Sequence, residues 1–389
     1  MVTSGVNEVN QSTGVLSDDA DVLGALDERF QIFVSRLPED RPIWFCFFSS
    51  GLLHVIQHFL RFVPDDLNCA FITSGLTREE GELWGELTSL PTFGMTESVG
   101  SHEIFELLFR NMDRPFGLVD SDCFVIRSEF FAECMADLKP GVAISGPLCY
   151  GPIPLAAPPF MAIDPRARIE IERAIGGSVS PAAYAFVPPG PEREIDGAMV
   201  RLIEEHHRAA LSTVLGMESA HLPFPQGGLM DVLDDGREVR SHERYHHRRV
   251  GHEIVRAVFD GLMFYQLMAL AAGMRIAHFR TFPGTKVFAP EMVHAGGISY
   301  WARLRESELT KAGIRTLPWS AHVDALLLTD FVEGTDAPEP YLQRSRDLDA
   351  VLRQSEMELD LPSLRRQLCA KLAETGADVT DPRWRPVLG

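Results

Sequence analysis

The stretch Phe-Gly-Leu-Val-Asp-Ser-Asp-Cys-Phe-Val-Ile, residues 116–126, sets two carboxylates one residue apart between apolar runs that are typical of a buried β-strand. Side chains alternate along a strand, so we predict that Asp120 and Asp122 point to the same face, with Cα atoms about 6–7 Å apart. Two like charges beside apolar sequence resist loss of solvent unless a cation lies between them. Hard oxygen ligands favour Mg²⁺ or Mn²⁺, which often bind through carboxylates together with substrate phosphates. The stretch therefore predicts a divalent metal site for a nucleotide-linked ligand.

A strand that ends at a turn is the alternative interpretation, since aspartate is common in turns. Strand-like residues return at 124–126, and neither glycine nor proline follows the aspartate pair. We therefore expect the strand to continue through both aspartates.

Strand-like and helix-like segments alternate around this stretch. The predicted strands are 43–48, 68–73, 116–126 and 141–148, and the predicted helices are 52–62, 101–112 and one from about Thr77. Such alternation predicts an α/β fold with a mostly parallel, Rossmann-type sheet flanked by helices on both faces. Ligands of these sheets lie beyond the carboxyl ends of the strands, where Asp120 and Asp122 fall.

Composition divides the chain into four parts. Residues 1–25 are polar and without apolar periodicity, so we expect a flexible lead before an α/β domain at 26–335. Within that domain, 192–257 is polar, charged and helix-like, and we expect a helical insertion there that contacts an acceptor. Residues 336–389 alternate charged and apolar positions at helical spacing, which predicts a helical C-terminal tail.

The overall charge excludes several classes of function. The 389 residues carry a formal net charge of −19, and 45% of them are hydrophobic, which is enough for a large core. So acidic a chain lacks the basic surface that nucleic acid or an anionic membrane requires, and we expect neither as a partner.

The amino terminus shows no signal peptide, and the apolar segment 261–274 is too short to span a membrane. We expect a cytoplasmic protein.

Two further features bear on redox state and assembly. The six cysteines show no paired metal-ligand spacing: Cys46, Cys69, Cys123, Cys134, Cys149 and Cys369. We expect reduced core residues rather than disulfides. The segment 146–161 contains Leu155, Phe160 and Met161, apolar residues that a second copy of the chain would cover, so a homo-oligomer is one expectation.

Three motifs follow the aspartate pair in an informative order. Asp260 precedes an amphipathic helix, Gly-Met-Arg-Ile at 273–276 forms a turn and strand, and Val-His-Ala-Gly-Gly-Ile-Ser follows at 293–299. This order resembles that of the GT-A-fold glycosyltransferases, most closely the family-2-like inverting enzymes. Those enzymes have an Asp-x-Asp metal site, an acidic motif at the head of a helix, a Gly-aromatic-Arg-Ile-like turn and a His-x-Gly-Gly-like segment. The resemblance covers roughly residues 43–301, with the middle poorly matched.

The resemblance implies a metal-dependent, inverting glycosyltransferase of the hexosyltransferase type, which moves a sugar from a nucleotide-diphosphate donor to an acceptor. Asp120 would contact the ribose or the metal shell, Asp122 would ligate Mn²⁺ or Mg²⁺, and His294 would complete the shell. Asp260 would be the general base that deprotonates the acceptor, while the metal neutralises charge on the leaving diphosphate. The acceptor stays open among a natural-product scaffold, a polysaccharide and a protein side chain.

The chain departs from this family at two motifs. The acidic motif reads Phe-Asp-Gly at 259–261 where the family usually has Glu-Asp, and the second strand ends in Thr-Ser-Gly at 73–75 where the family usually has an acidic residue. We therefore expect hydroxyl and backbone groups to hold the nucleotide, and we assign these contacts to Ser49, Ser74, Asp120 and Gly296. Outside the motif order, His294 is also typical of a loop histidine and Asp260 of a helix N-cap.

A zinc-dependent hydrolase is the main alternative. His242-Glu243-Arg244-Tyr245-His246 is a His-Glu-x-x-His sequence, and His252 follows at the spacing of a third zinc ligand in metzincin proteases. However, arginine stands at 249 where those proteases need glycine, and charged residues flank the motif on both sides.

The aspartate pair is also compatible with two different functions. Asp120 is the nucleophile position of a haloacid-dehalogenase-like phosphatase, but that motif normally lies near the start of its domain with Thr or Val where Phe124 stands. A relative that binds nucleotide sugars without catalysis, as a scaffold, would keep the fold and the aspartates.

Overall fold

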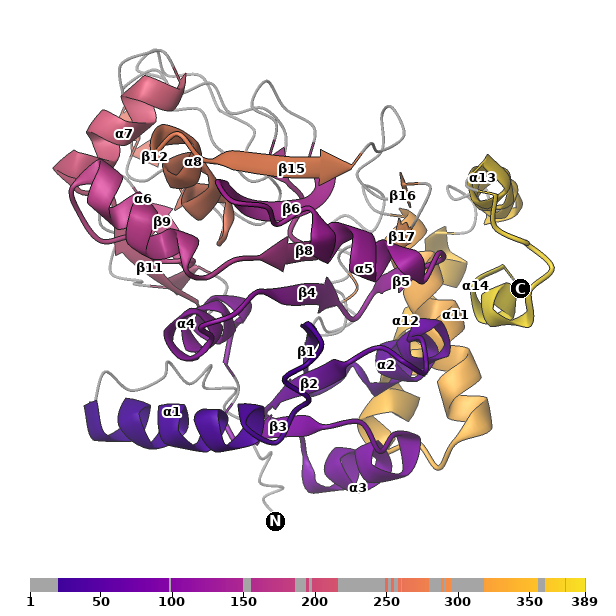
Figure 1. Ribbon diagram of the computed structural model, residues 1–389. Helices are drawn as coiled ribbons and strands as arrows, with labels where there is room; N and C mark the ends of the chain where they lie inside the picture. The colour runs from indigo at the N-terminus through magenta and orange to yellow at the C-terminus, as the bar shows by residue number, and fades with distance from the viewer. Residues whose placement is uncertain are drawn as a thin grey trace.

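A mostly parallel sheet forms the centre of the molecule, and its order is β15-β6-β8-β4-β1-β2-β3, with β7 paired to β6 (Figure 1). The computed structural model describes residues 20–97, 99–149, 155–185, 194–195, 198–215, 249–250, 253–254, 258–259, 261–279, 288–289, 292–295, 298, 318–355, 361–374 and 376–388. The strands of this sheet are β1 Ile43–Ser49, β2 Cys69–Ser74, β3 Thr92–Met95, β4 Phe116–Asp120, β6 Val142–Cys149, β7 Leu155–Ala156, β8 Phe160–Ile163 and β15 Arg275–Phe279. Parallel pairs join β1 to β2 and β4, β2 to β3, and β6 to β15, whereas β8 runs antiparallel between β4 and β6. The predicted α/β fold is confirmed.

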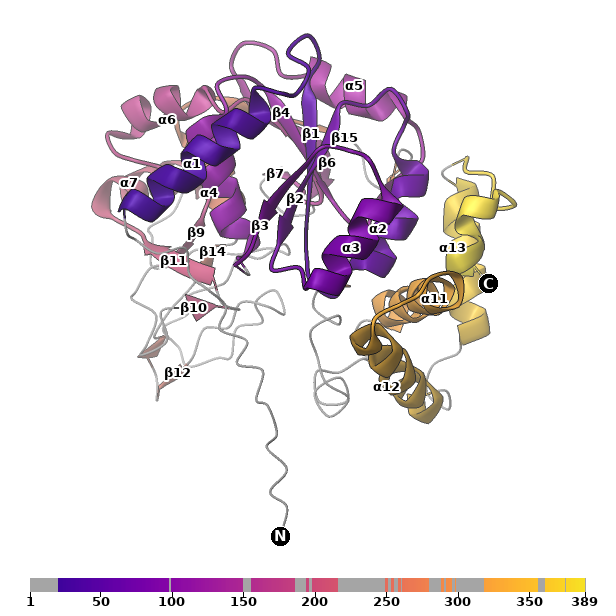
Figure 2. The same ribbon diagram turned by 90° about the horizontal axis from the view of Figure 1, so that it is seen from below.

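Residues of β1 alternate between two apolar cores, one on each face of the sheet. Ile43 and Phe45 belong to one core, and Trp44, Cys46 and Phe48 to the other, and all five side chains are buried. The helices that contribute to the first core are α1 Ala20–Val34, α4 Ser101–Asn111, α6 Ala167–Ile175, α7 Glu205–Leu215 and α8 Met263–Ala271. Those that contribute to the second include α2 Leu53–Phe59, η1 Leu60–Phe62, α3 Arg78–Leu87 and α5 Glu129–Ala136. Figure 2 shows α1, α4 and α6 on one side of the strands and α2 and α3 on the other.

Glycine at position 117 lets β4 lie against the aromatic core. A Cβ atom at Gly117 would lie 2.2 Å from the indole ring of Trp44, so a larger residue cannot fit without displacing that ring. Trp44 itself stacks on Phe160 of β8, with ring centroids 4.5 Å apart. The packing of these rings therefore helps to set the position of β4 between β1 and β8.

Within the ranges given above, three smaller sheets accompany the central one. Their strands are β5 Cys123–Val125, β9 Ala183–Ala185, β10 Glu194–Ile195, β11 Ala198–Leu202, β12 Arg249–Val250, β13 Glu253–Ile254, β14 Val258–Phe259, β16 Phe288–Ala289 and β17 Met292–His294. They pair in the orders β10-β11-β9-β14, β12-β13 and β16-β17-β5. The segment 192–257 was expected to be helical, but its described parts hold strands β10 to β13 as well as helix α7, so it is mixed. Strands of two to five residues among many charged residues show too little alternation to be predicted from the sequence.

The C-terminal part is helical, as predicted. It contains α11 Pro318–Gly334, α12 Glu339–Ser355, α13 Leu361–Glu374, η2 Pro382–Trp384 and α14 Arg385–Leu388. At the other end, α1 already begins at Ala20, and the rest of the expected lead, 1–19, lies outside the described residues. In the ranges that are described, no helix is long and apolar enough to cross a membrane.

The apolar side chains of the 146–161 segment are covered by the chain itself. Leu155 is 2% exposed and Phe160 and Met161 are 0% exposed. They were expected to be covered by a second copy, but β7 and β8 place them in the core of the central sheet. The homo-oligomer itself stays a prediction. Cys46, Cys69, Cys123 and Cys134 are likewise buried and free of disulfides, which fits the expected reduced core residues.

Candidate functional site

The carboxyl ends of β1 and β4 meet where the order of the central sheet changes direction. From β1 the chain proceeds to β2 and β3 on one side, while β4 lies on the other side of β1. Ligands of open α/β sheets bind beyond the strand ends at such a point. β1 ends at Ser49, β4 ends at Asp120, and Asp120 lies in register with Phe47. Two of the expected site residues, Ser49 and Asp120, therefore lie at the position where this fold binds ligands.

The chain turns between the two aspartates instead of continuing as one strand. β4 ends at Asp120, whose N–H donates to the Pro159 carbonyl at 2.8 Å, and Ser121 and Asp122 form the turn before β5. β5 then leaves the central sheet and pairs in antiparallel fashion with β17. The predicted continuous strand is wrong, and the turn that was weighed against it is present. Its residues form a turn without glycine or proline, because aspartate and serine tolerate turn conformations.

Pairing of β5 with β17 brings His294 to the aspartates. His294 lies opposite Cys123 in the ladder, and the Ala295 N–H donates to the Asp122 carbonyl at 2.8 Å. His294 Nε2 lies 3.2 Å from Asp122 Oδ1 and 3.9 Å from Asp120 Oδ2. One ligand atom from each of the three residues lies within 4.8 Å of the others. We call Asp120, Asp122 and His294 the carboxylate–histidine corner.

The three side chains of the corner differ in exposure. The Asp120 side chain is 55% exposed, whereas those of Asp122 and His294 are 10% and 15% exposed. The corner also influences the neighbouring thiol: burial above all, and then the two carboxylates, raise the pKa of Cys123 well above its ordinary value. Cys123 therefore stays a protonated thiol and is not a nucleophile.

The corner has the chemistry of a divalent metal site. Two carboxylates and one imidazole offer hard oxygen donors and one nitrogen donor, a set that suits Mn²⁺ or Mg²⁺ when phosphate oxygens or water complete the shell. Two carboxylates that lie this close together repel each other, and a cation between them would relieve that repulsion. These residues fit the metal that the sequence predicts.

The two serines predicted to contact a nucleotide occupy different environments. Ser74 is 0% exposed, and its hydroxyl donates to the Glu97 carbonyl at 3.0 Å and accepts from the Val99 N–H at 2.6 Å. That hydroxyl holds the loop before α4, so the geometry gives no support to a nucleotide contact at Ser74. Ser49, beside it in register, is buried at the end of β1, and its nucleotide contact stays a prediction.

Several predicted residues lie outside the described part of the chain. They are Asp260, Gly296 and the zinc-motif residues His242, Glu243, His246 and His252. The neighbours of Asp260 are described: Phe259 ends β14, and Gly261 packs so close to His102 that a Cβ atom would lie 2.4 Å from its Nδ1. The next residue, Leu262, has φ of 62°, a left-handed conformation that is unusual for a leucine.

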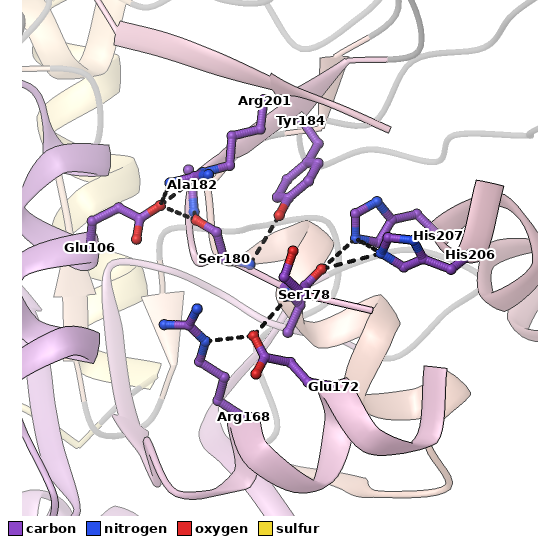
Figure 3. A network of polar contacts seen from close by, with 11 residues as sticks. Glu106, Arg168, Glu172, Ser178, Ser180, Ala182, Tyr184, Arg201, His206 and His207 are labelled. Carbon is purple, nitrogen blue, oxygen red and sulfur yellow. Dashed lines mark hydrogen bonds and ion pairs between the residues drawn. The ribbon is translucent and has the colours of Figure 1, made fainter. Parts of the chain in front are cut away.

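A network of polar contacts holds the segment that supports this turn (Figure 3). The Leu262 N–H donates to the Pro181 carbonyl at 2.9 Å, and β14 pairs with β9 through Phe259 and Tyr184. Beside Pro181, the Ser180 N–H donates to the Tyr184 hydroxyl at 3.0 Å, and the Ser180 hydroxyl donates to Glu106 of α4. The backbone on both sides of Pro181 is therefore fixed by buried partners.

Two adjacent histidines of α7 extend this network to the loop after α6. His207 Nδ1 accepts from the Glu204 N–H at 3.1 Å, so its proton lies on Nε2, which donates to the Ser178 carbonyl at 2.7 Å. His206 Nε2 lies 3.0 Å from His207 Nε2, and Figure 3 shows both rings converging on Ser178. Burial lowers the pKa of His207, which favours this neutral form. Because that nitrogen carries a proton, the pair is a hydrogen-bonding device rather than a metal site.

Sequence reasoning missed Glu80 and Tyr341, which lie next to the loop after β1. Glu80 lies in the first turn of the helix that was predicted from about Thr77, and Thr77 three residues before it gives a capping-box signal. Tyr341 lies in the C-terminal part and carries no local signal, because its partners are distant in sequence: it contacts Leu53, 288 positions away.

Comparisons with known proteins identify the family of this chain. Residues 24–168 match the family model described as the StrH glycosyltransferase N-terminal domain, and residues 288–384 match the one described as the StrH C-terminal domain. A protein of Streptomyces griseus, named dTDP-dihydrostreptose–streptidine-6-phosphate dihydrostreptosyltransferase, is 66% identical over 365 residues, which cover 94% of this chain and 94% of that protein. The first matched region contains Asp120 and Asp122, and the second contains His294.

Proposed function

Because the chain belongs to the StrH family of glycosyltransferases, and so transfers a sugar from a nucleotide-linked donor, we propose that it moves dihydrostreptose from dTDP-dihydrostreptose to streptidine 6-phosphate. The identity of 66% to a protein named for that activity supports both substrates. The acceptor is then a phosphorylated small molecule, not a polysaccharide or a protein side chain. The hexosyltransferase type and the cytoplasmic location stay predictions.

The carboxylate–histidine corner carries the proposal that the reaction is metal-dependent. We assign the binding of Mn²⁺ or Mg²⁺ to Asp120, Asp122 and His294, whose ligand atoms lie within 4.8 Å of one another. The chemistry that such an ion supplies is neutralisation of the charge that develops on the leaving diphosphate. Asp122 and His294 are mostly buried and held by the β5–β17 ladder, so they offer fixed ligands, while the exposed Asp120 faces the incoming nucleotide.

We also propose a GT-A-like, family-2-like inverting mechanism, in which Asp260 is the general base. An acceptor hydroxyl oxygen attacks the anomeric carbon of the donor, the bond from that carbon to the diphosphate oxygen breaks, and the hydroxyl proton passes to the Asp260 carboxylate. Displacement on one face with departure from the other inverts the anomeric centre. The turn beside Asp260 supports this role, since Leu262 is held in a left-handed conformation and Gly261 lies against His102.

Ser49 and Gly296 remain our proposed contacts for the donor. Ser49 ends β1 at the change of direction in the sheet, where a nucleotide is expected. Gly296 follows His294 by two residues, so its backbone would lie near the diphosphate when His294 contacts the metal.

Titration of dTDP tests the metal role directly. Isothermal titration calorimetry with dTDP and Mn²⁺ is expected to show binding that EDTA removes, and the Asp122→Asn variant should bind at least about 100-fold more weakly. Asp65→Asn is the matched control, since this exposed aspartate precedes β2 at the opposite end of the strands and should bind like the wild type. Equal dTDP affinity in the Asp122 variant, with or without Mn²⁺, would refute the metal site.

Mass spectrometry of the transfer reaction tests the substrates and the base. We expect the wild type to form a product that contains dihydrostreptose and streptidine 6-phosphate, and NMR of that product to show an inverted anomeric centre. The Asp260→Asn variant should keep the affinity for dTDP and lose the transfer. A variant that loses dTDP binding instead would place Asp260 in the nucleotide site.

A further inference from the structure

The loop after β1, residues 50–52, is held by groups that come from α3 and α12. The Gly51 N–H donates to Glu80 Oε1 at 2.7 Å, and the Leu53 N–H donates to the Tyr341 hydroxyl at 3.1 Å. The Tyr341 hydroxyl donates in turn to Glu80 Oε1 at 2.6 Å. One carboxylate and one phenol therefore fix two backbone groups at the carboxyl end of β1.

Glu80 is a buried carboxylate whose hydrogen bonds are satisfied. It is 3% exposed, and besides Gly51 and Tyr341 it accepts from the Thr77 N–H at 2.9 Å through Oε2. The Glu80 N–H donates back to the Thr77 hydroxyl at 3.2 Å, which completes a capping box at the start of α3. Charge-assisted hydrogen bonds of this kind are shorter and stronger than neutral ones. The position of Glu80 is therefore set by α3, and Glu80 sets the position of Gly51.

Tyr341 is 2% exposed and keeps its proton. Burial, and then the neighbouring Glu80, raise the pKa of the Tyr341 hydroxyl well above its ordinary value. The hydroxyl can therefore donate to Glu80 while it accepts from Leu53, and both of its hydrogen-bonding roles are used. Loss of this one oxygen atom would leave a backbone N–H without its partner.

A second set of buried contacts joins α2 to α11 and α12. His54 Nε2 lies 2.7 Å from Asp324 Oδ1, and Arg344 of α12 donates to the other oxygen of Asp324. Burial would raise the pKa of Asp324, but Arg344 and His54 outweigh it, so the carboxyl stays ionised with a lowered pKa. α11 lies beside α2 in both views of the molecule (Figure 1 and Figure 2). We call Glu80, Tyr341, His54, Asp324 and Arg344 the C-terminal brace.

Stability alone does not explain these polar groups. Buried ion pairs contribute little net stability compared with apolar residues of similar volume, because their desolvation offsets their attraction. The brace instead determines the backbone conformation of one loop, because its hydroxyl and its carboxylate accept hydrogen bonds from two particular N–H groups of that loop. Gly51 has φ of 87°, a left-handed conformation that glycine adopts without strain, and the Ser50 N–H donates to the Ser74 carbonyl at 3.3 Å. The backbone conformation of the loop is therefore fixed by hydrogen bonds at Ser50, Gly51 and Leu53.

We propose that Tyr341 and Glu80 are positioning residues for the nucleotide donor. They hold the backbone of residues 50–53 at the change of direction in the sheet, beside Asp120, in the conformation that receives the nucleoside diphosphate. The helices α11 and α12 are then part of the donor site, although they lie more than 200 positions after β1. This inference rests on the proposed function, because it assigns the loop to the donor of that reaction.

The Tyr341→Phe variant tests this role, since it removes one hydroxyl oxygen and keeps the ring. We expect its dissociation constant for dTDP with Mn²⁺ to rise about tenfold, and the donor KM with it, while the acceptor KM stays unchanged. The matched control is Asp330→Asn, which cuts the exposed Arg61–Asp330 ion pair between η1 and α11 without touching the loop. This control should bind dTDP like the wild type. Glu80→Gln serves as a second variant, and we expect the same selective rise in the donor KM.

Each outcome of this experiment decides something different. If Tyr341→Phe lowers the melting temperature but leaves dTDP affinity and donor KM unchanged, the brace is only structural and the inference is wrong. A rise in the acceptor KM alone would also overturn it, because the loop would then serve the acceptor. If the wild type itself binds no dTDP, the proposed function fails first and the inference falls with it. Thus the two failures are distinguishable.

Discussion

The carboxylate–histidine corner and the C-terminal brace both place ionisable groups near the carboxyl ends of the central strands, but they balance charge differently. In the corner, two carboxylates meet a single imidazole, and the Asp120 side chain is 55% exposed. In the brace, the Asp324 side chain is 0% exposed and faces both Arg344 and His54. The Asp120 carboxylate of the corner is thus open to solvent and to a ligand, whereas the Asp324 carboxylate of the brace is buried against a cation of the chain itself.

This difference separates two tasks. A site for a cation needs carboxylates that an ion can reach from solvent, so the ion itself becomes one of their partners. A brace must hold one geometry whether or not a ligand is bound, so its partners all come from the chain. We therefore expect substitutions in the brace to act mainly on folding and on loop position, and substitutions in the corner to act mainly on ligand binding.

The largest expected effect on stability follows from removal of the buried anion of the brace. Asp324→Ala leaves Arg344 without its buried counter-ion, and we expect the free energy of unfolding to fall by about 3–5 kcal/mol. Urea denaturation followed by tryptophan fluorescence measures this. Asp330→Asn on the same helix removes an ion pair whose side chains are 36% and 39% exposed, and it should cost less than about 1 kcal/mol. Equal losses of stability in the two variants would show that burial does not increase the contribution of the Asp324 ion pair to the free energy of unfolding.

A smaller effect is expected from acid, through a histidine between the two regions. His58 of α2 is buried, its ring meets Phe124 of β5 with centroids 4.8 Å apart, and neither ring nitrogen has a partner. Burial, and then Arg61 and Arg383, lower its pKa to about 3 from 6.5. The unfolded chain therefore binds a proton at His58 between these values while the folded chain does not, so stability falls as the pH drops below 6.5.

Replacement of His58 should reduce the loss of stability at low pH. Between pH 7.5 and pH 5 we expect His58→Phe to lose about 2 kcal/mol less stability than the wild type. Urea denaturation at the two pH values measures the difference. The acid-sensitive groups of the brace, His54 and Asp324, are the same in both proteins and cancel in the comparison. An identical loss in the two proteins would mean that His58 takes up its proton without unfolding.

The smallest effect compares one substitution at two buried tyrosines. Tyr341→Phe removes a hydroxyl with two partners and should lower the free energy of unfolding by about 1–2 kcal/mol. Tyr265→Phe in α8 removes a buried hydroxyl that has no partner, so we expect stability to stay unchanged or to rise by up to about 1 kcal/mol. Thermal unfolding of both variants under one buffer condition gives the comparison. A loss at position 265 as large as that at 341 would contradict it.

Much of the central sheet could be predicted from the sequence because its strands carry strong local patterns. β1 and β2 are continuous apolar runs, and α4 shows helical spacing, so their bounds agree with prediction to within a few residues. The antiparallel strand β8 was not predicted, since Pro and Gly beside it indicated only a loop. The turn at Ser121 and Asp122 was rejected for want of glycine or proline, although the two carboxylates still converge, through β5 and β17.

The candidate site was predicted in part, and distance along the chain explains the rest. Asp120, Asp122 and His294 were named together from the order of motifs, and the structure brings them together. Ser74 was assigned to the nucleotide because of its position after a strand, but burial directs its hydroxyl to the backbone of another loop. The brace escaped prediction because a hydrogen bond between residues 288 positions apart leaves no trace in local periodicity.

The antiparallel pairing of β5 with β17 has a consequence for how this enzyme could be divided or recombined. It joins a strand of the region 24–168, which matches the N-terminal family model, to a strand of the region 288–384, which matches the C-terminal one. Asp122 and His294 come together through this strand pairing. Two fragments made separately would each hold only part of the proposed metal site, so activity would have to grow with the product of their concentrations. In a chimera of two relatives, replacing residues 288–384 would exchange His294 and Tyr341 in one step, and both would have to suit a host that supplies Asp122 and Glu80.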